Sequence, residues 1–446
     1  MDVEAGIMPL SGEDLARLRA QFPILGRTLR HDVPLVYLDS GATSQRPDSV
    51  IGAMADFDAR SNSAVHRGAH QVAEEATEAY EQARATVARF VGADADEIVW
   101  TKNATEGINV LALGISDASA GLGPQPDTAP DPRLVIGPGD TVVVTVLEHH
   151  ANLVPWQRLC ERTGARLAWI GVTDDGRLDP ATFDVIDETC RVLAFTGASN
   201  VTGALTDVPA LVARARAVGS GGSRAGERGP IVVLDACQLA PHRPLDLHAL
   251  DVDAAVFSSH KMYGPTGIGV LYGRRDVLAA LPPVLTGGSM VRKVTMERTY
   301  FADAPARFEA GSQPITQAVG LRAAVDFLGG IGMDAVVAHE DALTARLLVG
   351  IATVPHVRVL GPLEARDRLG VVAFEVEGVH PHDVGQVLDD AGVAVRVGHH
   401  CAQPVHQRFG VAASARASVG VYTSEADVDA FVEQLTRVRP FFGYDA

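Results

Sequence analysis

The stretch Ala255-Val256-Phe257-Ser258-Ser259-His260-Lys261-Met262-Tyr263-Gly264-Pro265-Thr266-Gly267 decides the fold. An apolar run with strand character ends in two serines, and a histidine, a lysine and a glycine-containing turn follow. A lysine at the mouth of a buried strand is partly desolvated, which favours a neutral, nucleophilic amine. Such an amine can hold an aldehyde cofactor as a Schiff base. Taken alone, Lys261 also fits an ordinary surface position after an edge strand, so the rest of the chain must decide.

Short apolar strands alternate with helical segments along most of the chain. The pattern predicts a long helix at 72–90 and strands at 36–39, 97–101, 141–146, 167–172, 191–196, 231–234, 254–257 and 268–272. Strands that alternate with helices predict an α/β fold with a mainly parallel, doubly wound sheet. Ligand sites in such sheets lie at the carboxyl ends of the strands.

Polar residues directly follow four of these strands. The four sets are Glu148-His149-His150, Ser199-Asn200, Asp235-Ala236-Cys237-Gln238 and Ser258-Ser259-His260-Lys261. Because the carboxyl ends of parallel strands meet at one edge of a sheet, we expect these side chains to share one site. This coincidence is the main reason to assign Lys261 a functional role.

Three of these residues suit a heteroaromatic cofactor. Asp235, 26 residues before Lys261, could bind a protonated ring nitrogen and make the ring an electron sink. Gln238 could donate to a phenolate oxygen, and His149 could stack on the ring. Each also has a structural alternative: a helix N-cap for Asp235, a surface amide for Gln238 and a hydrogen-bonded structural histidine for His149.

A helix is predicted to begin within Asn103-Ala104-Thr105-Glu106-Gly107, directly after a strand. The free N–H groups and the dipole of such a helix start attract a phosphate group. Thr105 could contribute to that anion site, or it could serve only as the N-cap.

Paired histidines and a cysteine raise two further possibilities. His149, His150, His399, His400, Cys401 and His406 could ligate a metal, but none has the paired spacing of a structural zinc site. Cys401 lies in a loop between glycine and histidine residues, where a partly exposed thiol can act as a nucleophile; the alternative is a small buried apolar residue. Arg416 could bind a carboxylate through two parallel hydrogen bonds, or form a surface ion pair.

Composition limits the class of protein. The 446 residues are 47% hydrophobic, and 38 basic against 55 acidic residues give a net charge of −17. This balance argues against nucleic-acid and acidic-membrane partners. We expect no signal peptide, because the first residues lack a basic segment followed by an apolar one, and no membrane span, because no run of about 18 apolar residues occurs. Four cysteines without CxxC spacing favour a reducing cytoplasm.

The chain is predicted to form three regions. Residues 1–35, with a short helix near 12–19, are expected to pack with a smaller C-terminal domain at 317–446, and residues 36–316 are expected to form the large domain. The C-terminal domain reads as helix, strand, strand, helix, with strands at 371–376 and 393–397 and a final helix at 425–438. Residues 116–139 and 219–229 are interpreted as loop insertions without a chemical role.

Several motifs together resemble one family. They are Tyr37-Leu38-Asp39-Ser40, Val65-His66-Arg67-Gly68, Thr105-Glu106-Gly107-Ile108-Asn109, Glu148-His149-His150-Ala151-Asn152, Ser199-Asn200-Val201-Thr202-Gly203, Asp235-Ala236-Cys237-Gln238, His260-Lys261-Met262-Tyr263-Gly264-Pro265, Arg307-Phe308-Glu309-Ala310-Gly311 and Arg396-Val397-Gly398-His399-His400-Cys401. From about residue 15 to its end, the chain resembles the Suf-type (group II) cysteine desulfurases. These are pyridoxal-phosphate enzymes of the class V aminotransferase family.

The resemblance implies a fold-type I architecture with a seven-stranded sheet, and a homodimer that shares its active sites. It assigns the Schiff base with pyridoxal 5'-phosphate to Lys261, which would also move the substrate Cα proton. The remaining cofactor contacts would come from Ala104, Thr105, His149, Asn200, Asp235, Gln238, Ser258 and His260, with Ser312 reaching in from the other subunit. His66, Asn200 and Arg416 would bind the substrate.

The resemblance also implies the reaction and its partner. Cys401 would take sulfur from L-cysteine as a persulfide, release L-alanine and pass the sulfur to a SufU-like or SufE-like acceptor protein for iron–sulfur cluster assembly. Selenocysteine lyase, an epimerase-like class V enzyme without sulfur transfer and a cofactor-free scaffold remain the alternatives. Three positions depart from the family pattern. Gly197 stands where many relatives have a histidine, which would remove a polar wall of the pocket, Ser259 replaces a glycine and Ser312 replaces a threonine.

Overall fold

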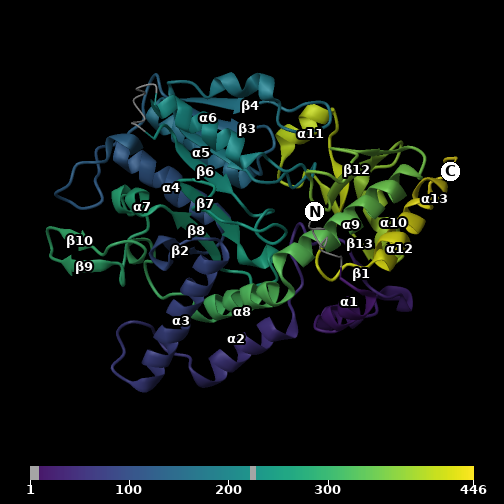
Figure 1. The fold of residues 1–446 in the computed structure, drawn as a ribbon, viewed down its shortest axis with the longest axis horizontal. Helices are drawn as coiled ribbons and strands as arrows, with labels where there is room; N and C mark the ends of the chain where they lie inside the picture. The colour runs from purple at the N-terminus through teal and green to yellow at the C-terminus, as the bar shows by residue number, and fades with distance from the viewer. Residues whose placement is uncertain (1–9, 221–227, 446) are drawn as a thin grey trace, which may run out of the picture.

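The computed structural model describes residues 10–220 and 228–445. Figure 1 shows a large part built on a wide sheet and a smaller part that carries the C-terminus. The first residues, on which the signal-peptide expectation rests, and most of the predicted 219–229 loop lie outside the described residues. Within them, every helix is too short or too polar to cross a bilayer.

A seven-stranded sheet organises the large part, in the order β2-β8-β7-β6-β5-β3-β4. Its strands are β2 (Ile98–Thr101), β3 (Thr141–Thr145), β4 (Arg166–Ile170), β5 (Cys190–Thr196), β6 (Ile231–Asp235), β7 (Ala254–Ser258) and β8 (Gly269–Gly273). The five strands from β7 to β4 pair in parallel, and β8 runs antiparallel to both of its neighbours. The prediction of a mainly parallel, seven-stranded α/β sheet is confirmed.

The central strands are apolar because helices cover both faces of the sheet. All residues of β3, β5, β6, β7 and β8 are buried, as expected for parallel strands between two helical layers. Helix α4 (Ala104–Ser119) packs closely on β7: a Cβ added at Gly107 would lie 2.8 Å from Cγ1 of Val256. This close approach holds the start of α4 beside the end of β7.

Helices complete the large part. They are α2 (Asp48–Arg60), α3 (Gln71–Phe90), α4, α5 (Val154–Thr163), α6 (Val208–Ser220), α7 (Arg275–Ala280) and α8 (Ile315–Ile331). Helix α8 lies along α2 and α3 at the bottom of Figure 1 and leads into the smaller part. The predicted domain boundary at 316/317 falls near the start of α8, and the division into domains stays a prediction. A short hairpin, β9 (Val291–Val294) with β10 (Thr299–Phe301), was not predicted.

The smaller part contains a four-stranded antiparallel sheet, in the order β11-β12-β15-β14. Its strands are β11 (Val357–Val359), β12 (Val371–Val376), β15 (Ser414–Ser418) and β14 (Arg396–Gly398), and helices α9 (Met333–Ala352), α10 (Pro381–Asp390), α11 (Gln403–Phe409), α12 (Glu425–Leu435) and α13 (Val438–Phe441) accompany them. The helix-strand-strand-helix prediction was partly wrong: the strand at 371–376 is β12 and the final helix begins at Glu425 as predicted, but the order of elements differs. It missed β11 and β15, and it merged β14 with β13 (Val393–Ala394), which instead pairs in parallel with β1 (Val36–Tyr37).

The N-terminal helix is confirmed as α1 (Gly12–Arg19). Its last residue, Arg19, forms an ion pair with Asp427 of α12, and Arg30 pairs with Asp389 of α10. The segment before β1 therefore contacts the C-terminal part of the chain. The loop predicted at 116–139 was partly wrong, because α4 continues to Ser119 and a 3₁₀ turn covers Pro132–Leu134.

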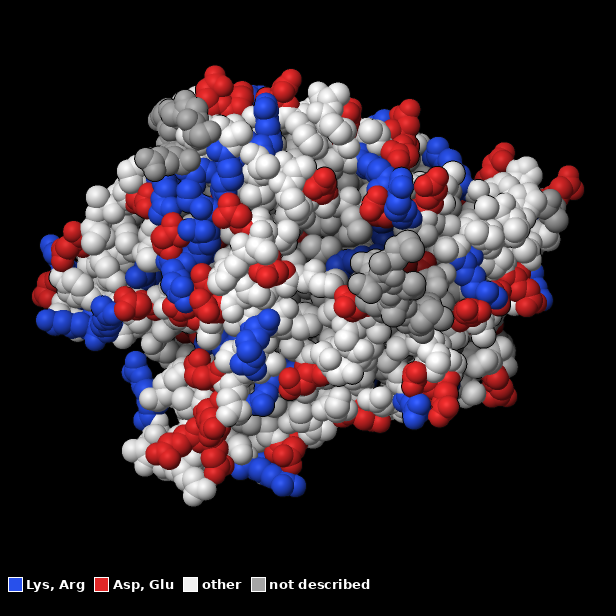
Figure 2. Space-filling model, in the orientation of Figure 1, with Lys and Arg blue, Asp and Glu red and all other residues white. Residues whose placement is uncertain are grey.

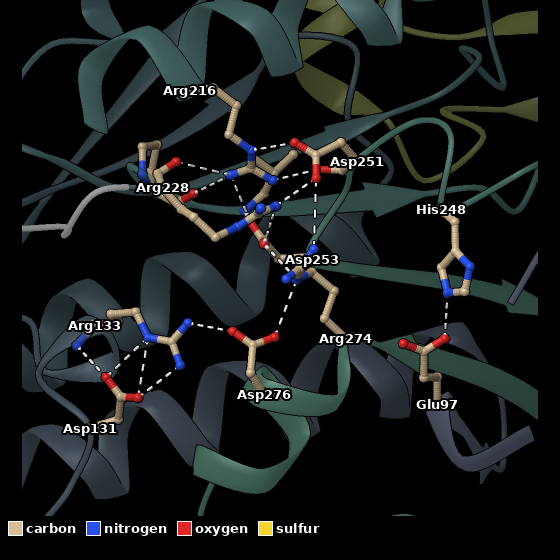
Figure 3. Close-up of polar contacts among 12 residues, drawn as sticks. Glu97, Asp131, Arg133, Arg216, Arg228, His248, Asp251, Asp253, Arg274 and Asp276 are labelled. Carbon is tan, nitrogen blue, oxygen red and sulfur yellow. Dashed lines mark hydrogen bonds and ion pairs between the residues drawn. The ribbon is translucent and has the colours of Figure 1, made fainter. Parts of the chain in front are cut away.

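Charged side chains concentrate at the edge of the large sheet where β6 and β7 begin. Arg216 donates to Asp251 and Asp253, Asp253 accepts from the backbone N–H of Val232, and Arg228 adds a contact to Asp251 (Figure 3). Elsewhere on the face shown in Figure 2, basic and acidic side chains are intermixed. The network ties the amino ends of the two strands together, at the edge opposite to the predicted site.

Candidate active site

A cavity of about 590 Å³ lies at the carboxyl ends of the large-sheet strands, where the smaller part meets the sheet. Of the predicted site residues, it is lined by Ala104, Thr105, His149, Asn200, Asp235, Gln238, Ser258, His260, Lys261, Cys401 and Arg416. Its volume is in the range of small-molecule binding pockets. The tertiary structure therefore brings the amine of Lys261 and the thiol of Cys401 to one cavity.

The start of α4 forms one wall of the cavity. The hydroxyl oxygen of Ser258 accepts a hydrogen bond of 2.9 Å from the backbone N–H of Ala104, which fastens the end of β7 to the start of the helix. Asn103, not Thr105, is the N-cap, because its side chain accepts from the N–H of Glu106. Thr105 therefore lies in the first turn of the helix, where backbone N–H groups and the dipole favour an anion.

The carboxylate of Asp235 is oriented by its own turn. It is buried and accepts a 2.9 Å hydrogen bond from the backbone N–H of Cys237. The helix N-cap alternative for Asp235 was wrong, because a turn and not a helix follows it in the described chain; the second carboxylate oxygen is not needed for that turn. The amide nitrogen of Gln238 donates to the carbonyl of Gly41, while its buried oxygen has no hydrogen-bond partner among the described residues.

His149 is held as a neutral ring. Its Nδ1 accepts a 3.0 Å hydrogen bond from the backbone N–H of Ala151, and burial, aided by the charge of Lys261, lowers its pKa to about 3. Burial also lowers the pKa of His260 to about 4. Both histidines line the cavity without a positive charge at neutral pH, which suits His149 to a stacking contact.

Glu148, beside His149, is a buried carboxyl group. It accepts hydrogen bonds from the hydroxyl of Thr145, the amide of Asn152 and the backbone N–H of Thr196. Burial raises its pKa to about 8, against the effect of these donors. These contacts join the loop after β3 to the end of β5, and so position His149.

Cys401 lies in a loop of four residues between β14 and α11, and its side chain is exposed. His400 and Cys401 both adopt the left-handed region, with φ of 49° and 55°. The amide of Asn200 donates to the carbonyl of His400 at 2.6 Å, and the N–H of His150 donates to the carbonyl of Cys401 at 2.7 Å. Two hydrogen bonds from the large part thus stabilise a backbone conformation that is unfavourable for non-glycine residues.

Arg416 is fully buried on β15. Its Nη1 donates to the carbonyl of Asn200 at 2.8 Å, and its Nη2 lies 3.6 Å from Asp39. Its Nε and Nη2 have no hydrogen-bond partner among the described residues. Adjacent Nε–H and Nη2–H groups can bind a carboxylate through two parallel hydrogen bonds. Burial lowers the pKa of Arg416 to about 10, which is still well above neutral pH.

Sequence reasoning missed Arg396 as a site residue. Its guanidinium lines the same cavity and forms a bidentate pair with Asp39, with distances of 2.8–3.2 Å. Asp39 and Arg396 both occur in motifs that signalled the family, but 357 residues separate them along the chain. No local pattern could have shown that they form a pair.

Two predicted site residues lie outside the cavity. His66 is exposed and bonds to Glu81 at 2.9 Å. Ser312 lines a separate cavity of about 230 Å³. The loop that carries Ser312 follows Glu309, whose buried carboxylate binds Arg84, Tyr80 and the backbone N–H of Trp100.

Two further expectations concern metal binding and Gly197. Among the described residues, one group of three potential metal ligands has its ligating atoms within 4.8 Å of one another: Asp94, Glu97 and His248. The histidines near Cys401 do not belong to this group. Gly197 does not line the cavity; a Cβ there would lie 2.9 Å from the side chain of Leu239. The expectation that glycine in place of a histidine at position 197 removes a polar wall of the pocket was wrong. Gly197 lies against leucine side chains and not at the cavity.

Comparisons with known proteins agree on one family. The sequence model described as Aminotransferase class-V matches residues 36–431. The chain is 52% identical to the "probable cysteine desulfurase 2" of Mycobacterium leprae, over 96% of this chain and 98% of that protein. It is 48% identical to the "probable cysteine desulfurase" of Streptomyces coelicolor, again over 96% and 98%. The solved structure of the cysteine desulfurase CsdA from Escherichia coli superimposes with a TM-score of 0.82 at 35% identity, over 96% of this chain and 98% of that one.

The Lys261 turn allows a test of the serine at 259. A Cβ added at Gly264 would lie 2.1 Å from Oγ of Ser259, a buried hydroxyl without a hydrogen-bond partner in the described part of the chain. We expect Gly264→Ala to lower the free energy of unfolding by about 1–3 kcal/mol in the wild type. In the Ser259→Gly background the same substitution should cost much less, because the hydroxyl is gone. Urea unfolding of the four proteins measures the coupling, and additive effects would contradict the close contact.

Buried histidines predict loss of stability in acid. Burial lowers the pKa of His400 to about 2, so between its unfolded value near 6.5 and pH 3 the unfolded chain binds a proton that the folded ring does not. Stability therefore falls with decreasing pH in this window, by about 1.4 kcal/mol per pH unit for one such group. Between pH 6.5 and 5.5, we expect the free energy of unfolding of His400→Asn, measured by urea unfolding, to fall by about 1 kcal/mol less than that of the wild type. The exposed control His382→Asn should keep the wild-type loss, and equal losses in all three proteins would disprove the assignment.

Proposed function

The chain belongs to the aminotransferase class-V family, and we propose that it is a cysteine desulfurase of the Suf type that supplies sulfur for iron–sulfur cluster assembly. It is a pyridoxal-phosphate enzyme, and its relatives at 48% and 52% identity are named cysteine desulfurases. The single observation that carries the proposal is the shared cavity of Lys261, Cys401 and Arg416. A nucleophilic amine, a thiol and a carboxylate-binding guanidinium are the groups that sulfur removal from an amino acid requires.

The residues present fit pyridoxal phosphate. The cavity contains a buried carboxylate at Asp235, an amide at Gln238 whose nitrogen has a second N–H besides the one that binds Gly41, and a neutral aromatic ring at His149. The phosphate would bind at the start of α4, with Thr105, Ser258 and His260 around it, and Lys261 would hold the aldehyde covalently. When bound, the cofactor supplies an electron-withdrawing ring that stabilises negative charge on the substrate Cα.

The chain's own residues then bind and convert L-cysteine. Arg416 offers Nε–H and Nη2–H to the substrate carboxylate, while Asn200 holds the guanidinium from its other side. Lys261, as a free amine, would be the group that removes the Cα proton. The thiolate of Cys401 attacks the substrate sulfur: an S–S bond forms, and the Cβ–S bond breaks and leaves its electron pair on the substrate. Cβ then gains a proton, and Cα regains the proton that Lys261 removed. L-Cysteine and the enzyme thiol thus give L-alanine and an enzyme persulfide.

The exposure of Cys401 supports transfer of this sulfur to another protein. The Cys401 loop has only four residues, and hydrogen bonds from the large part hold two of its carbonyl groups. Because these contacts restrict the movement of Cys401, the acceptor thiol must come to the mouth of the cavity. We propose a SufU-like or SufE-like acceptor and a cytoplasmic location. The thiol that accepts the sulfur must be reduced before each turnover, and all four cysteines are free, as is usual for cytosolic proteins.

A homodimer would account for the two site residues outside the cavity. Ser312 and His66 do not line the cavity of their own subunit, and both are exposed. In the proposed dimer, each would reach the cavity of the other subunit, with the Ser312 hydroxyl on the cofactor phosphate. The buried ion pair of Glu309 with Arg84 (2.7 and 2.9 Å) would hold that loop in place.

Substitution of the thiol tests the activity. We expect Cys401→Ser to lower alanine release from L-cysteine by more than a hundredfold, because a hydroxyl cannot accept the sulfur. Mass spectrometry of the wild type after incubation with L-cysteine should show one additional sulfur atom on the peptide that contains Cys401. Cys160→Ser, a substitution of a buried thiol outside the cavity, is the matched control and should still gain the additional sulfur atom on Cys401. Unchanged alanine release in Cys401→Ser would refute sulfur transfer to Cys401, and a wild type that releases no alanine would favour an epimerase-like enzyme.

Ser312 tests the shared site. We expect sedimentation to show a dimer, and Ser312→Ala to weaken retention of pyridoxal phosphate about tenfold, through loss of a hydrogen bond to a charged group. Ser312→Thr keeps the hydroxyl and should bind as the wild type does. A monomer that turns over cysteine at the full rate, or equal cofactor affinity in both variants, would refute the shared site.

A further inference from the structure

Under the Cys401 loop, two histidines and a serine form a chain of hydrogen bonds. Ser414 on β15 lies 2.9 Å from Nε2 of His400 and 2.9 Å from Nε2 of His406. The Nδ1 of His406 lies 3.0 Å from the carbonyl oxygen of Ala402. All three side chains are buried. Each of the three contacts therefore needs a defined donor and acceptor.

The carbonyl of Ala402 fixes the direction of the whole chain. A carbonyl oxygen only accepts, so Nδ1 of His406 must carry the hydrogen, and its Nε2 in the neutral ring accepts from the Ser414 hydroxyl. Ser414 then accepts from Nε2–H of His400. Burial keeps both rings neutral, because it lowers the pKa of each. Nδ1 of His400 is consequently left without a hydrogen.

That bare nitrogen has no hydrogen-bond partner within residues 10–220 and 228–445, although its residue is only 7% exposed and lines the cavity. An unpaired buried acceptor is costly, and it indicates a donor that the described contacts do not yet supply. Ser414 and Arg416, two residues apart on β15, lie on the same face of the strand. His400, bonded to Ser414, therefore lies on the side of β15 that carries Arg416; both residues line the cavity, and the charge of Arg416 lowers the pKa of His400.

The guanidinium has N–H groups to spare. Arg416 carries five, of which one from Nη1 binds the carbonyl of Asn200. A carboxylate bound side-on would take Nε–H and one N–H of Nη2. Two N–H groups of this buried side chain remain, one on Nη1 and one on Nη2, and Nη2 lies 3.6 Å from Asp39.

We propose that Nδ1 of His400 accepts a hydrogen bond from the guanidinium of Arg416 when an amino-acid carboxylate is bound, and that Ser414 and His406 act as positioning residues by fixing the tautomer of His400. The opposite tautomer would direct an N–H of His400 at the N–H groups of Arg416. His400 thus positions Arg416 and contributes to selection of substrates with a carboxylate. This inference rests on the proposed function only in taking Arg416 as the carboxylate-binding group.

Two variants of His400 isolate the acceptor. Both His400→Leu and His400→Asn lose the bond to Ser414, but only asparagine retains an acceptor near the position of Nδ1. The pyridoxal-phosphate-loaded enzyme is titrated with L-alanine and with ethylamine, which has the same amine but no carboxylate. Binding is followed by the visible absorbance of the cofactor. These readouts do not require desulfurase activity, so they separate this inference from the proposed function.

We expect L-alanine to bind about tenfold more weakly to His400→Leu than to His400→Asn, and ethylamine to bind equally to both. Ser414→Ala keeps His400 but removes the hydroxyl that fixes its tautomer. This variant should also bind L-alanine more weakly and should bind ethylamine as the wild type does. Equal L-alanine constants in the two His400 variants would overturn the proposal. So would an equal weakening of ethylamine, because it would show that the substitution disturbs the Cys401 loop rather than Arg416.

Discussion

Asn200 joins the two parts of the molecule at the cavity. Its side-chain amide donates to the carbonyl of His400 in the Cys401 loop, and its backbone carbonyl accepts from Arg416 on the smaller sheet. Both contacts are buried, where hydrogen bonds are strong and unpaired groups are costly. One residue at the end of a large-sheet strand thus sets where the thiol and the guanidinium lie relative to Lys261.

The remaining walls of the cavity follow the same physical rule, in which strand ends are fastened to neighbouring elements by single polar contacts. Ser258 binds the first N–H of α4, Glu148 ties the loop after β3 to β5, and Gln238 holds the turn at Gly41. The charged network of Figure 3 does the same at the opposite edge of the sheet. Rigid anchoring of this kind lets short loops carry reactive groups in fixed geometry.

Neutral rings are a second common feature of the site. Burial lowers the pKa of His149, His260 and His400, so the cations that line the cavity among the residues discussed above are Lys261, Arg396 and Arg416. A neutral His149 can contact an aromatic ring without adding charge, and a neutral His400 can accept a hydrogen bond beside a guanidinium. The same histidines, when met as a sequence, suggested a metal site, because spacing alone does not reveal protonation or orientation.

The sequence by itself predicted the strands of the large sheet and the polar residues that follow them, because apolar runs and strand-end residues are local signals. It also identified Lys261, Asp235 and Cys401 as candidate site residues. It did not reveal the four-stranded sheet, since β11 and β15 are short and β15 is interrupted by a buried arginine. Only the tertiary structure decided that Asp39 pairs with Arg396, that Leu239 fills the space at Gly197 and that Ser414 links two histidines. Each of these depends on contact between residues distant along the chain, which no local pattern encodes.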